Sequence, residues 1–183
     1  MKTDVTLTIT PKMLDDAKKS EKKELEGHLG THFDVMDKEF PLEYTERDGI
    51  IFDVSGIERE IQVSDIELDK VRPESFVLFY TGFADSEPYG SYRYFKEHPR
   101  LSNELIDALL EKGISMIGLD FAGARRGKEH FPVDQRCADK GVFIVENLCN
   151  LQSLLGKSEL KIHTYPMRII GVTGLPCRVI AEI

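Results

Sequence analysis

Residues 102–119, SNELIDALLEKGISMIGL, contain a helical pattern followed at once by an apolar run. Ser102 is a typical N-cap residue, leucine and isoleucine then recur at helical spacing up to Lys112, and Gly113 ends the pattern. The apolar run at 114–119 has the length and composition of a buried strand. A helix beside a buried strand is the basic unit of α/β proteins, so this stretch predicts that fold class.

The sequence on either side predicts further elements of the same kind. A second helix is expected over about 132–140, before Gly141, and the charged segment 12–26 is expected to be a solvated helix or a mobile loop. The last two apolar runs flank Thr173-Gly174-Leu175-Pro176, which is typical of a turn. Residues 1–183 are therefore expected to form a single α/β domain with a mixed sheet. The predicted strands besides 114–119 are residues 4–10, 49–54, 76–80, 142–145, 167–172 and 177–183.

The composition favours a soluble globular protein and excludes several classes of partner. Of 183 residues, 41% are hydrophobic and 31% are charged, and 24 basic against 32 acidic residues give a net charge of −8. A surface of this sign repels nucleic-acid phosphates and anionic lipid heads, so we expect neither nucleic acid nor a membrane as a partner. The longest apolar run, 76–80, is far shorter than the roughly 20 residues that cross a bilayer.

The cysteines and the first residues bear on the compartment. Cys137, Cys149 and Cys177 are widely spaced and form no Cys-x-x-Cys pair, which argues against a disulfide framework and against a thiolate zinc site. Met1 and Lys2 are not followed by an apolar stretch of the kind found in secretory signals. We therefore expect a cytoplasmic protein.

The segment Gly27-His28-Leu29-Gly30-Thr31-His32-Phe33-Asp34 is the first candidate for chemistry. In an extended chain His28, His32 and Asp34 share one face, because all their offsets are even. Residues two apart on a strand are about 7 Å apart and can meet one metal ion, whereas residues four apart are about 13 Å apart, so a bend at Gly30 is needed to bring in His28. Imidazole and carboxylate ligands suit zinc, with manganese or iron as alternatives. The other interpretation is a pair of surface histidines near an acid.

Glu146 is the second candidate, because it follows the apolar strand 142–145. A carboxylate there is costly to desolvate without a cation or hydrogen-bond donors, so Glu146 is a candidate ligand or base. The alternative is a strand-end acid that reaches water or a backbone N–H. Asp134, twelve residues earlier on the predicted helix, is by itself an ordinary polar helix residue.

The motif His28-Leu-Gly-Thr-His32-Phe-Asp34 resembles the His-x-Gly-Thr-His-x-Asp signature of the putative cyclase family, whose best-known members are bacterial kynurenine formamidases. Other segments resemble further family motifs in the same order along the chain. The resemblance covers about residues 28–183 and is weakest between 38 and 70. The matching segments are Tyr80-Thr81-Gly82-Phe83, residues 94–102, Gly118-Leu119-Asp120, Phe131-Pro132-Val133 and residues 145–151.

The resemblance implies a swivelling β/β/α-type fold, one or two divalent metal ions and a homo-oligomer, either a dimer or a tetramer. It carries the metal-ligand roles over to His28, His32, Asp34 and Glu146. Family members use this centre to activate water for attack on an amide or formyl group, and a zinc-bound water can have a pKa of about 7.

Two departures from the formamidase pattern concern this site. Asp134 stands where formamidases have a histidine ligand; an aspartate can also bind zinc or manganese, but it shifts the preference toward harder ions. His130, four residues earlier, is expected to have a structural or surface role, and it is the first candidate for a spare ligand. Lys38 stands where formamidases have a histidine that acts as general acid and base, and lysine is a poor base at neutral pH unless its pKa is lowered. A nearby metal can lower it, a neighbouring acid (Asp37 or Glu39) can take the role, or Lys38 is a solvated charge.

Several further residues are candidates for substrate contacts. Arg125 and Arg126 are candidates for binding a substrate carboxylate, and His98 and His163 are expected to have structural or surface roles. The candidates for an aromatic pocket wall, with ordinary packing as the alternative, are Tyr80, Phe83, Tyr89, Tyr92 and Tyr94.

The sequence and the resemblance together predict a metal-dependent hydrolase that acts on a C–N bond of a small, non-peptide amide. Zinc is the favoured metal, the metal ligands are His28, His32, Asp34, Asp134 and Glu146, and the catalytic candidates are Lys38 and Glu146. The two departures weaken the case for kynurenine formamidase activity itself. The alternatives are lactone hydrolysis or dehydration on the same centre, or a protein that has lost catalysis and binds a metal or a small molecule.

Overall fold

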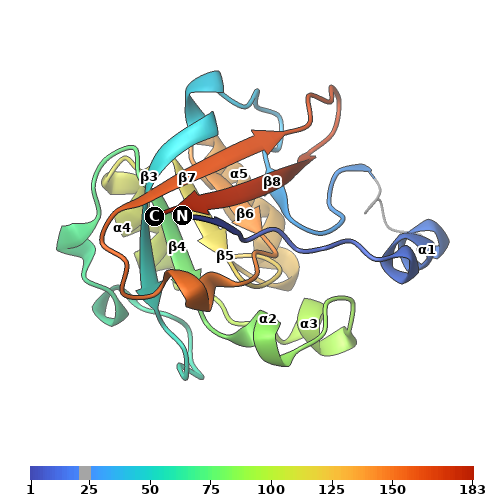
Figure 1. Cartoon of the computed structure of the whole chain (residues 1–183), viewed down its shortest axis with the longest axis horizontal. Helices are drawn as coiled ribbons and strands as arrows, with labels where there is room; N and C mark the ends of the chain where they lie inside the picture. The colour runs from blue at the N-terminus through green and yellow to red at the C-terminus, as the bar shows by residue number, and fades with distance from the viewer. Residues whose placement is uncertain (21–25) are drawn as a thin grey trace.

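The computed structural model describes residues 1–20 and 26–183. These residues form a mixed eight-stranded sheet with the order β1-β8-β2-β6-β5-β4-β3-β7 (Figure 1). Neighbours from β3 to β6 in this order are parallel, and the other pairs are antiparallel. The strands are β1 (Lys2–Asp4), β2 (His32–Asp34), β3 (Glu46–Asp53), β4 (Phe76–Tyr80), β5 (Met116–Leu119), β6 (Phe143–Glu146), β7 (Leu160–Pro166) and β8 (Gly174–Glu182).

Strand β8 closes the sheet into a barrel-like ring of seven strands, because β7 pairs with both β3 and β8. Along its other edge β8 pairs first with β2, where Gly174 lies opposite Asp34, and then with β1, where Glu182 lies opposite Lys2. Figure 1 shows β7 and β8 crossing over β4 and β5. The mixed α/β fold predicted from the sequence is thereby confirmed.

The central strands are apolar throughout because both of their faces are buried. In β4, Phe76, Leu78 and Tyr80 belong to the core inside the closed sheet, whereas Val77 and Phe79 belong to the core under the helices. All five side chains are at most 8% exposed. This arrangement is typical of parallel strands covered on both sides.

The helices are α1 (Pro11–Lys19), α2 (Phe83–Ser86), α3 (Tyr92–Lys96), α4 (Asn103–Glu111) and α5 (His130–Asp139). Helix α4 begins as predicted, with the Ser102 hydroxyl accepting a hydrogen bond from the Leu105 N–H. Helices α4 and α5 pack their apolar residues on the sheet, so α5 lies against β6. Within the described ranges, no helix combines the length and the apolar character that spanning a membrane requires.

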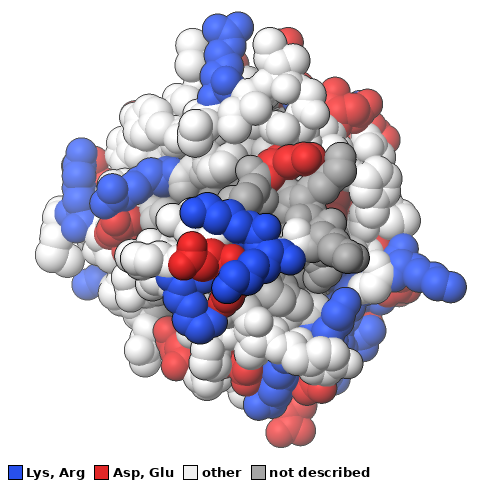
Figure 2. All heavy atoms as spheres, turned by 90° about the vertical axis from the view of Figure 1, so that its right-hand side faces the viewer, with Lys and Arg blue, Asp and Glu red and all other residues white. Residues whose placement is uncertain are grey.

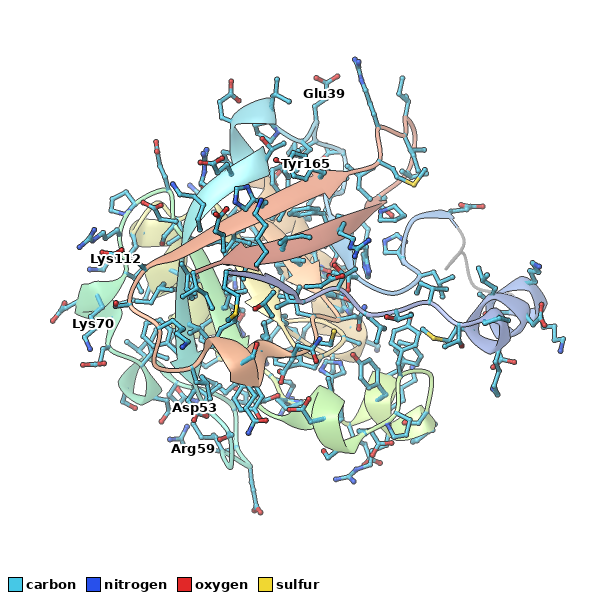
Figure 3. All side chains as sticks on the ribbon, in the orientation of Figure 1. Glu39, Asp53, Arg59, Lys70, Lys112 and Tyr165 are labelled. Atoms are coloured by element: carbon cyan, nitrogen blue, oxygen red, sulfur yellow. The ribbon has the colours of Figure 1, made fainter. Side chains whose placement is uncertain are left out.

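Charges of both signs are interspersed on the outer surface. Helix α1 lies to one side of the sheet in Figure 1, and Figure 2, which views that side, shows basic and acidic groups next to one another. Lys12 pairs with Asp16 within α1. Elsewhere Glu39, Lys70 and Lys112 lie at the periphery (Figure 3).

Three strand predictions need correction. Residues 167–172 are not a strand but part of the connection between β7 and β8, where Ile170 is 94% exposed. The alternating residues 160–166, for which we predicted no strand, form β7 instead, and the expected turn around Gly174 is the beginning of β8. The predicted strand 4–10 is also wrong, because after β1 the chain forms no further strand there and makes one isolated bridge, between Thr6 and Leu148.

The charged segment 12–26 was expected to be a solvated helix or a mobile loop. Most of its first half belongs to helix α1, and residues 21–25 lie outside the described ranges.

Candidate metal centre

Strands β2 and β6 place three candidate ligands side by side. His32 lies opposite Glu146 in the antiparallel register, and Asp34 lies two residues along β2 on the same face. Gly30 has a φ of +71°, which bends the chain just before β2 and brings back His28. Both imidazoles then reach one acid: His28 Nε2 and His32 Nε2 each lie 3.5 Å from Asp34 Oδ1.

Helix α5 contributes the other side of the cluster. His130 and Asp134 lie one helical turn apart, with 3.1 Å between His130 Nε2 and Asp134 Oδ2. Glu146 bridges the two sides, because its Oε1 is 3.2 Å from His130 Nε2 and its Oε2 is 3.7 Å from His32 Nε2. The structure therefore brings together all five residues predicted as metal ligands, and adds His130 to them.

The donor atoms of this cluster fit a divalent cation. Among the described residues, only five buried side-chain nitrogen or oxygen atoms have no hydrogen-bond partner, and four of these belong to His32, Asp34, Asp134 and Glu146. Unpaired buried polar atoms are costly, and a bound cation would satisfy them. Two sets of three residues have ligand atoms within 4.8 Å of one another, namely His28, His32 and Asp34, and Asp34, His130 and Asp134. Asp34 is common to both sets, so the geometry has room for one ion or two.

Burial and mutual attraction shift the pKa values of the cluster. Burial raises the pKa of Asp134 to about 8. Burial and the nearby Asp34 charge also raise the pKa of Glu146. Burial opposes the charged form of His32, but Asp34 and Glu146 outweigh it and raise the His32 pKa to about 9. Asp34 keeps a lowered pKa despite its burial because His32 stabilises the carboxylate. Such a concentration of shifted groups is typical of functional sites.

A second layer of hydrogen bonds fixes the orientation of His32. Its Nδ1 donates to the Gly30 carbonyl at 2.9 Å, so that Nε2 faces the acids. The Asn147 amide donates to the same carbonyl at 2.9 Å and accepts from the Tyr94 hydroxyl at 3.0 Å. Asn147 has a φ of +60° and is buried directly after Glu146. These contacts fix the ring orientation and the tautomer, as outer partners of metal-binding histidines do.

Two glycines leave space for the imidazoles. A Cβ at Gly123 would lie 2.7 Å from His130 Cε1, and the residue has a φ of +108°. A Cβ at Gly174 would lie 2.7 Å from His28 Nε2. A larger residue at either position would displace a ring of the cluster.

A cavity of about 450 Å³ lies against the cluster. Its walls combine apolar side chains, among them Met36, Phe95 and Phe131, with the cations Lys96 and Arg126. His98 also lines it; this ring is 1% exposed and stacks on Phe121. A concave, partly apolar space beside a polar cluster is the usual form of a small-molecule site.

Lys38, expected as a catalytic base, lies elsewhere and is not among the residues that line this cavity. Its Nζ is 2.7 Å from Asp139 Oδ1 and 3.1 Å from Asp37 Oδ1. These hydrogen bonds raise its pKa, whereas a base needs a lowered one. Lys38 is therefore not positioned for proton transfer in this cavity.

Of the residues predicted to contact substrate, some line the cavity and others are buried elsewhere. Arg125 is buried between Glu60 and Glu129, whereas Arg126 lines the cavity. Tyr94 is buried, and the aromatic rings that do line the cavity are Phe95 and Phe131, neither of which we predicted as a substrate contact. Thr173 and His98 are also cavity residues missed as site residues. The sequence signals for Phe131 were the family-like segment Phe131-Pro132-Val133 and its position next to His130.

Comparison with known proteins places the fold. The family model described as Putative cyclase matches residues 3–124. The chain belongs to this family. A solved structure described as "The Structure Of Potential Metal-Dependent Hydrolase With Cyclase Activity" has the same fold. Its TM-score is 0.76 and its identity is 23%, over 99% of this chain and 96% of that one. No curated protein gives a significant match.

Two other structures share the cyclase-family fold. A predicted metal-dependent hydrolase from Bacillus stearothermophilus has a TM-score of 0.71 and 21% identity, over 99% of this chain and 97% of that one. Isatin hydrolase A from Labrenzia aggregata, bound to benzyl benzoate, also has a TM-score of 0.71 and 21% identity, over 83% of this chain and 72% of that one.

Proposed function

We propose that this cyclase-family protein is a metal-dependent hydrolase that cleaves a C–N bond in a small, non-peptide amide. The observation that carries the proposal is the set of four buried atoms on His32, Asp34, Asp134 and Glu146 that could bind a metal and make no hydrogen bond, directly beside a cavity of small-molecule size. The names of the structural neighbours, metal-dependent hydrolases and isatin hydrolase, support the same reaction class.

The residues that would hold the cation are His28, His32, Asp34, His130, Asp134 and Glu146. Zinc is the favoured metal because the set mixes imidazole with carboxylate, and manganese is the alternative because three of the six are acids. When bound, such an ion polarises a carbonyl oxygen and lowers the pKa of water. The positive charge of the ion would also balance the three carboxylates. Without the ion, only the imidazoles among the described residues lie close enough to do so.

The cavity residues supply binding and proton acceptors. Phe95, Phe131 and Met36 provide apolar surface for the body of the substrate. His98 Nδ1 is 2.8 Å from the Pro99 carbonyl and must donate to it, which leaves Nε2 as an acceptor. Burial lowers the His98 pKa to about 4, so this ring is neutral at pH 7. Hydrolysis adds the oxygen of water to the carbonyl carbon, breaks the C–N bond and leaves the nitrogen protonated.

A substrate screen on metal-loaded protein tests the proposal. Purified protein is stripped with chelator, reloaded separately with Zn²⁺ and Mn²⁺, and assayed with isatin, formanilide and a small lactone. We expect turnover of at least one amide, loss of that turnover in His32→Ala, and retention in His163→Ala. His163 is a matched control because it lies on β7, where its Nε2 is 3.1 Å from Glu182 Oε2.

The other outcomes separate the rival functions. If only the lactone is hydrolysed, the protein acts on an ester-type bond at the same centre, and the amide proposal is wrong. Stoichiometric metal binding without turnover of any compound would identify a binding protein that has lost catalysis.

A further inference from the structure

Arg126 is an arginine of the cavity wall whose guanidinium is held in place by a neutral group. One of its amino groups, Nη1, donates a 3.0 Å hydrogen bond to the Lys96 carbonyl. Within residues 1–20 and 26–183, no carboxylate lies within ion-pair distance of this guanidinium. Its other donors therefore remain available to a ligand.

The neighbouring arginines are different. Arg125 Nη2 lies 2.6 Å from Glu129 Oε2 and its Nη1 lies 3.1 Å from Glu60 Oε1. Arg100 Nη2 lies 3.1 Å from the same Glu60 oxygen. Arg93 pairs with Glu87 and Glu97. Arg126 differs from these three arginines because it has no acidic partner among the residues that the structure describes.

The position of Arg126 relates it to the candidate metal centre. It lines the same cavity as His32, His130 and Glu146, and it also lines a second depression of about 400 Å³ on its other side. His98 lines both spaces, so Arg126 and His98 mark the boundary between them. Lys96 also lines this cavity, and it makes no ion pair with a carboxylate in the described part of the chain.

We propose that Arg126 forms an anion subsite and that the substrate is an amide carrying a carboxylate. This inference rests on the proposed function for the amide, but the subsite itself can be tested without turnover. A guanidinium binds a carboxylate through two parallel N–H donors, which gives direction as well as affinity. Phe95 and Phe131 line the same cavity as Arg126 and the candidate metal centre, so the body of the substrate is a small apolar or aromatic group.

Binding of the three aminobenzoate isomers, each compared with its methyl ester, tests the subsite. Each acid and its ester differ in charge but have the same ring, and neither contains the N-acyl bond that the proposed reaction cleaves. Isothermal titration of zinc-loaded protein is expected to show at least one acid binding about tenfold or more tightly than its ester. Arg126→Gln should remove this preference, and Arg126→Lys should keep part of it.

Arg93→Gln is the matched control, because it removes one arginine charge from the same face at a residue that lines only the second depression. It should leave the preference unchanged. Circular dichroism and the thermal midpoint of each variant report on folding, and Arg126→Met serves in place of Arg126→Gln if the latter does not fold.

Three results would overturn the subsite: equal affinity for acid and ester, a preference that survives in Arg126→Gln, or no binding of any isomer. The corresponding N-formyl compounds are assayed in parallel for hydrolysis. If these compounds are not hydrolysed, the result counts against the proposed function only. The titration tests the Arg126 subsite by binding, so it does not depend on catalysis.

Discussion

His130 Nε2 lies 3.1 Å from Asp134 Oδ2, one turn away on α5, and 3.2 Å from Glu146 Oε1 on β6. Asp134 was the predicted ligand at the position where formamidases have a histidine, and the neighbouring turn of the helix supplies the imidazole. The site thus keeps a nitrogen donor on α5 and gains a carboxylate.

The space that Gly123 leaves for His130 provides a test of this arrangement. Gly123→Ala is expected to displace the ring and to lower zinc affinity about tenfold or more, measured by competition with a chromophoric chelator. Gly127→Ala is the control, because Gly127 also has a positive φ but a Cβ added there would meet nothing within 4 Å. Gly127→Ala should lose about 1–2 kcal/mol of stability from backbone strain, and Gly123→Ala should lose more, because its Cβ would also lie 3.0 Å from the Arg125 carbonyl oxygen. An equal loss of zinc affinity in both would exclude a specific role for the space at Gly123.

Zinc is expected to raise the thermal midpoint of the metal-free protein, because ligands that bind only the folded state stabilise it. At a free concentration of 100 times Kd the gain is about 2.7 kcal/mol. His32→Ala should abolish the shift and the metal retained after dialysis, measured by calorimetry and elemental analysis. His163→Ala should show the wild-type shift. Full retention of metal by His32→Ala would remove His32 from the ligand set.

Asn147 is expected to stabilise the site through its two side-chain hydrogen bonds. Asn147→Ala leaves the Gly30 carbonyl and the Tyr94 hydroxyl without this partner and places alanine at a φ of +60°. The expected loss is about 3 kcal/mol in the free energy of unfolding, against about 1 kcal/mol for Tyr94→Phe, which removes one bond only. Urea denaturation of the metal-free proteins measures both values, and equal losses would contradict the double role of Asn147.

Asp120 is expected to make stability fall as the pH rises. Burial raises its pKa from 3.8 to about 6, although hydrogen bonds from Thr81 and Gly82 oppose the shift. Between these two values the folded state binds a proton that the unfolded state has lost, so stability decreases with increasing pH by about 3 kcal/mol in all. The unfolding free energy of the wild type, relative to that of Asp120→Asn, should therefore fall from pH 4 to pH 6 and stay constant above pH 7. A difference that does not change with pH would show that Asp120 titrates normally.

The sequence predicted the parts of the fold whose pattern is local. The apolar run 76–80 coincides with β4, and the helix after Ser102 begins where its cap predicts. The turn between the last two strands was predicted at the wrong place. Gly174 is a residue typical of turns, but here it begins β8, and its missing side chain leaves space for the His28 ring. That requirement comes from a residue far away in the chain, so no local pattern reveals it.

The sequence predicted those residues of the candidate site that lie in a short motif or stand out in an apolar strand. His28, His32 and Asp34 lie within seven residues, and Glu146 stands out as an acid at the end of an apolar strand. Lys38 is close to this motif in sequence, but after β2 the chain turns so that Lys38 meets Asp139 instead of the cavity. Arg126 could not be separated from Arg125 by sequence, because only the fold shows that Glu60 and Glu129 neutralise one and not the other.

Strand β2 is held on one edge by β6 and on the other by β8. During synthesis on the ribosome, the histidine segment therefore emerges early but gains its second neighbour only when the last strand has been made. We expect the cluster of His28, His32 and Asp34 to reach its final arrangement only once β8 has paired with β2, so that a cation would load onto the closed sheet and not onto the emerging segment.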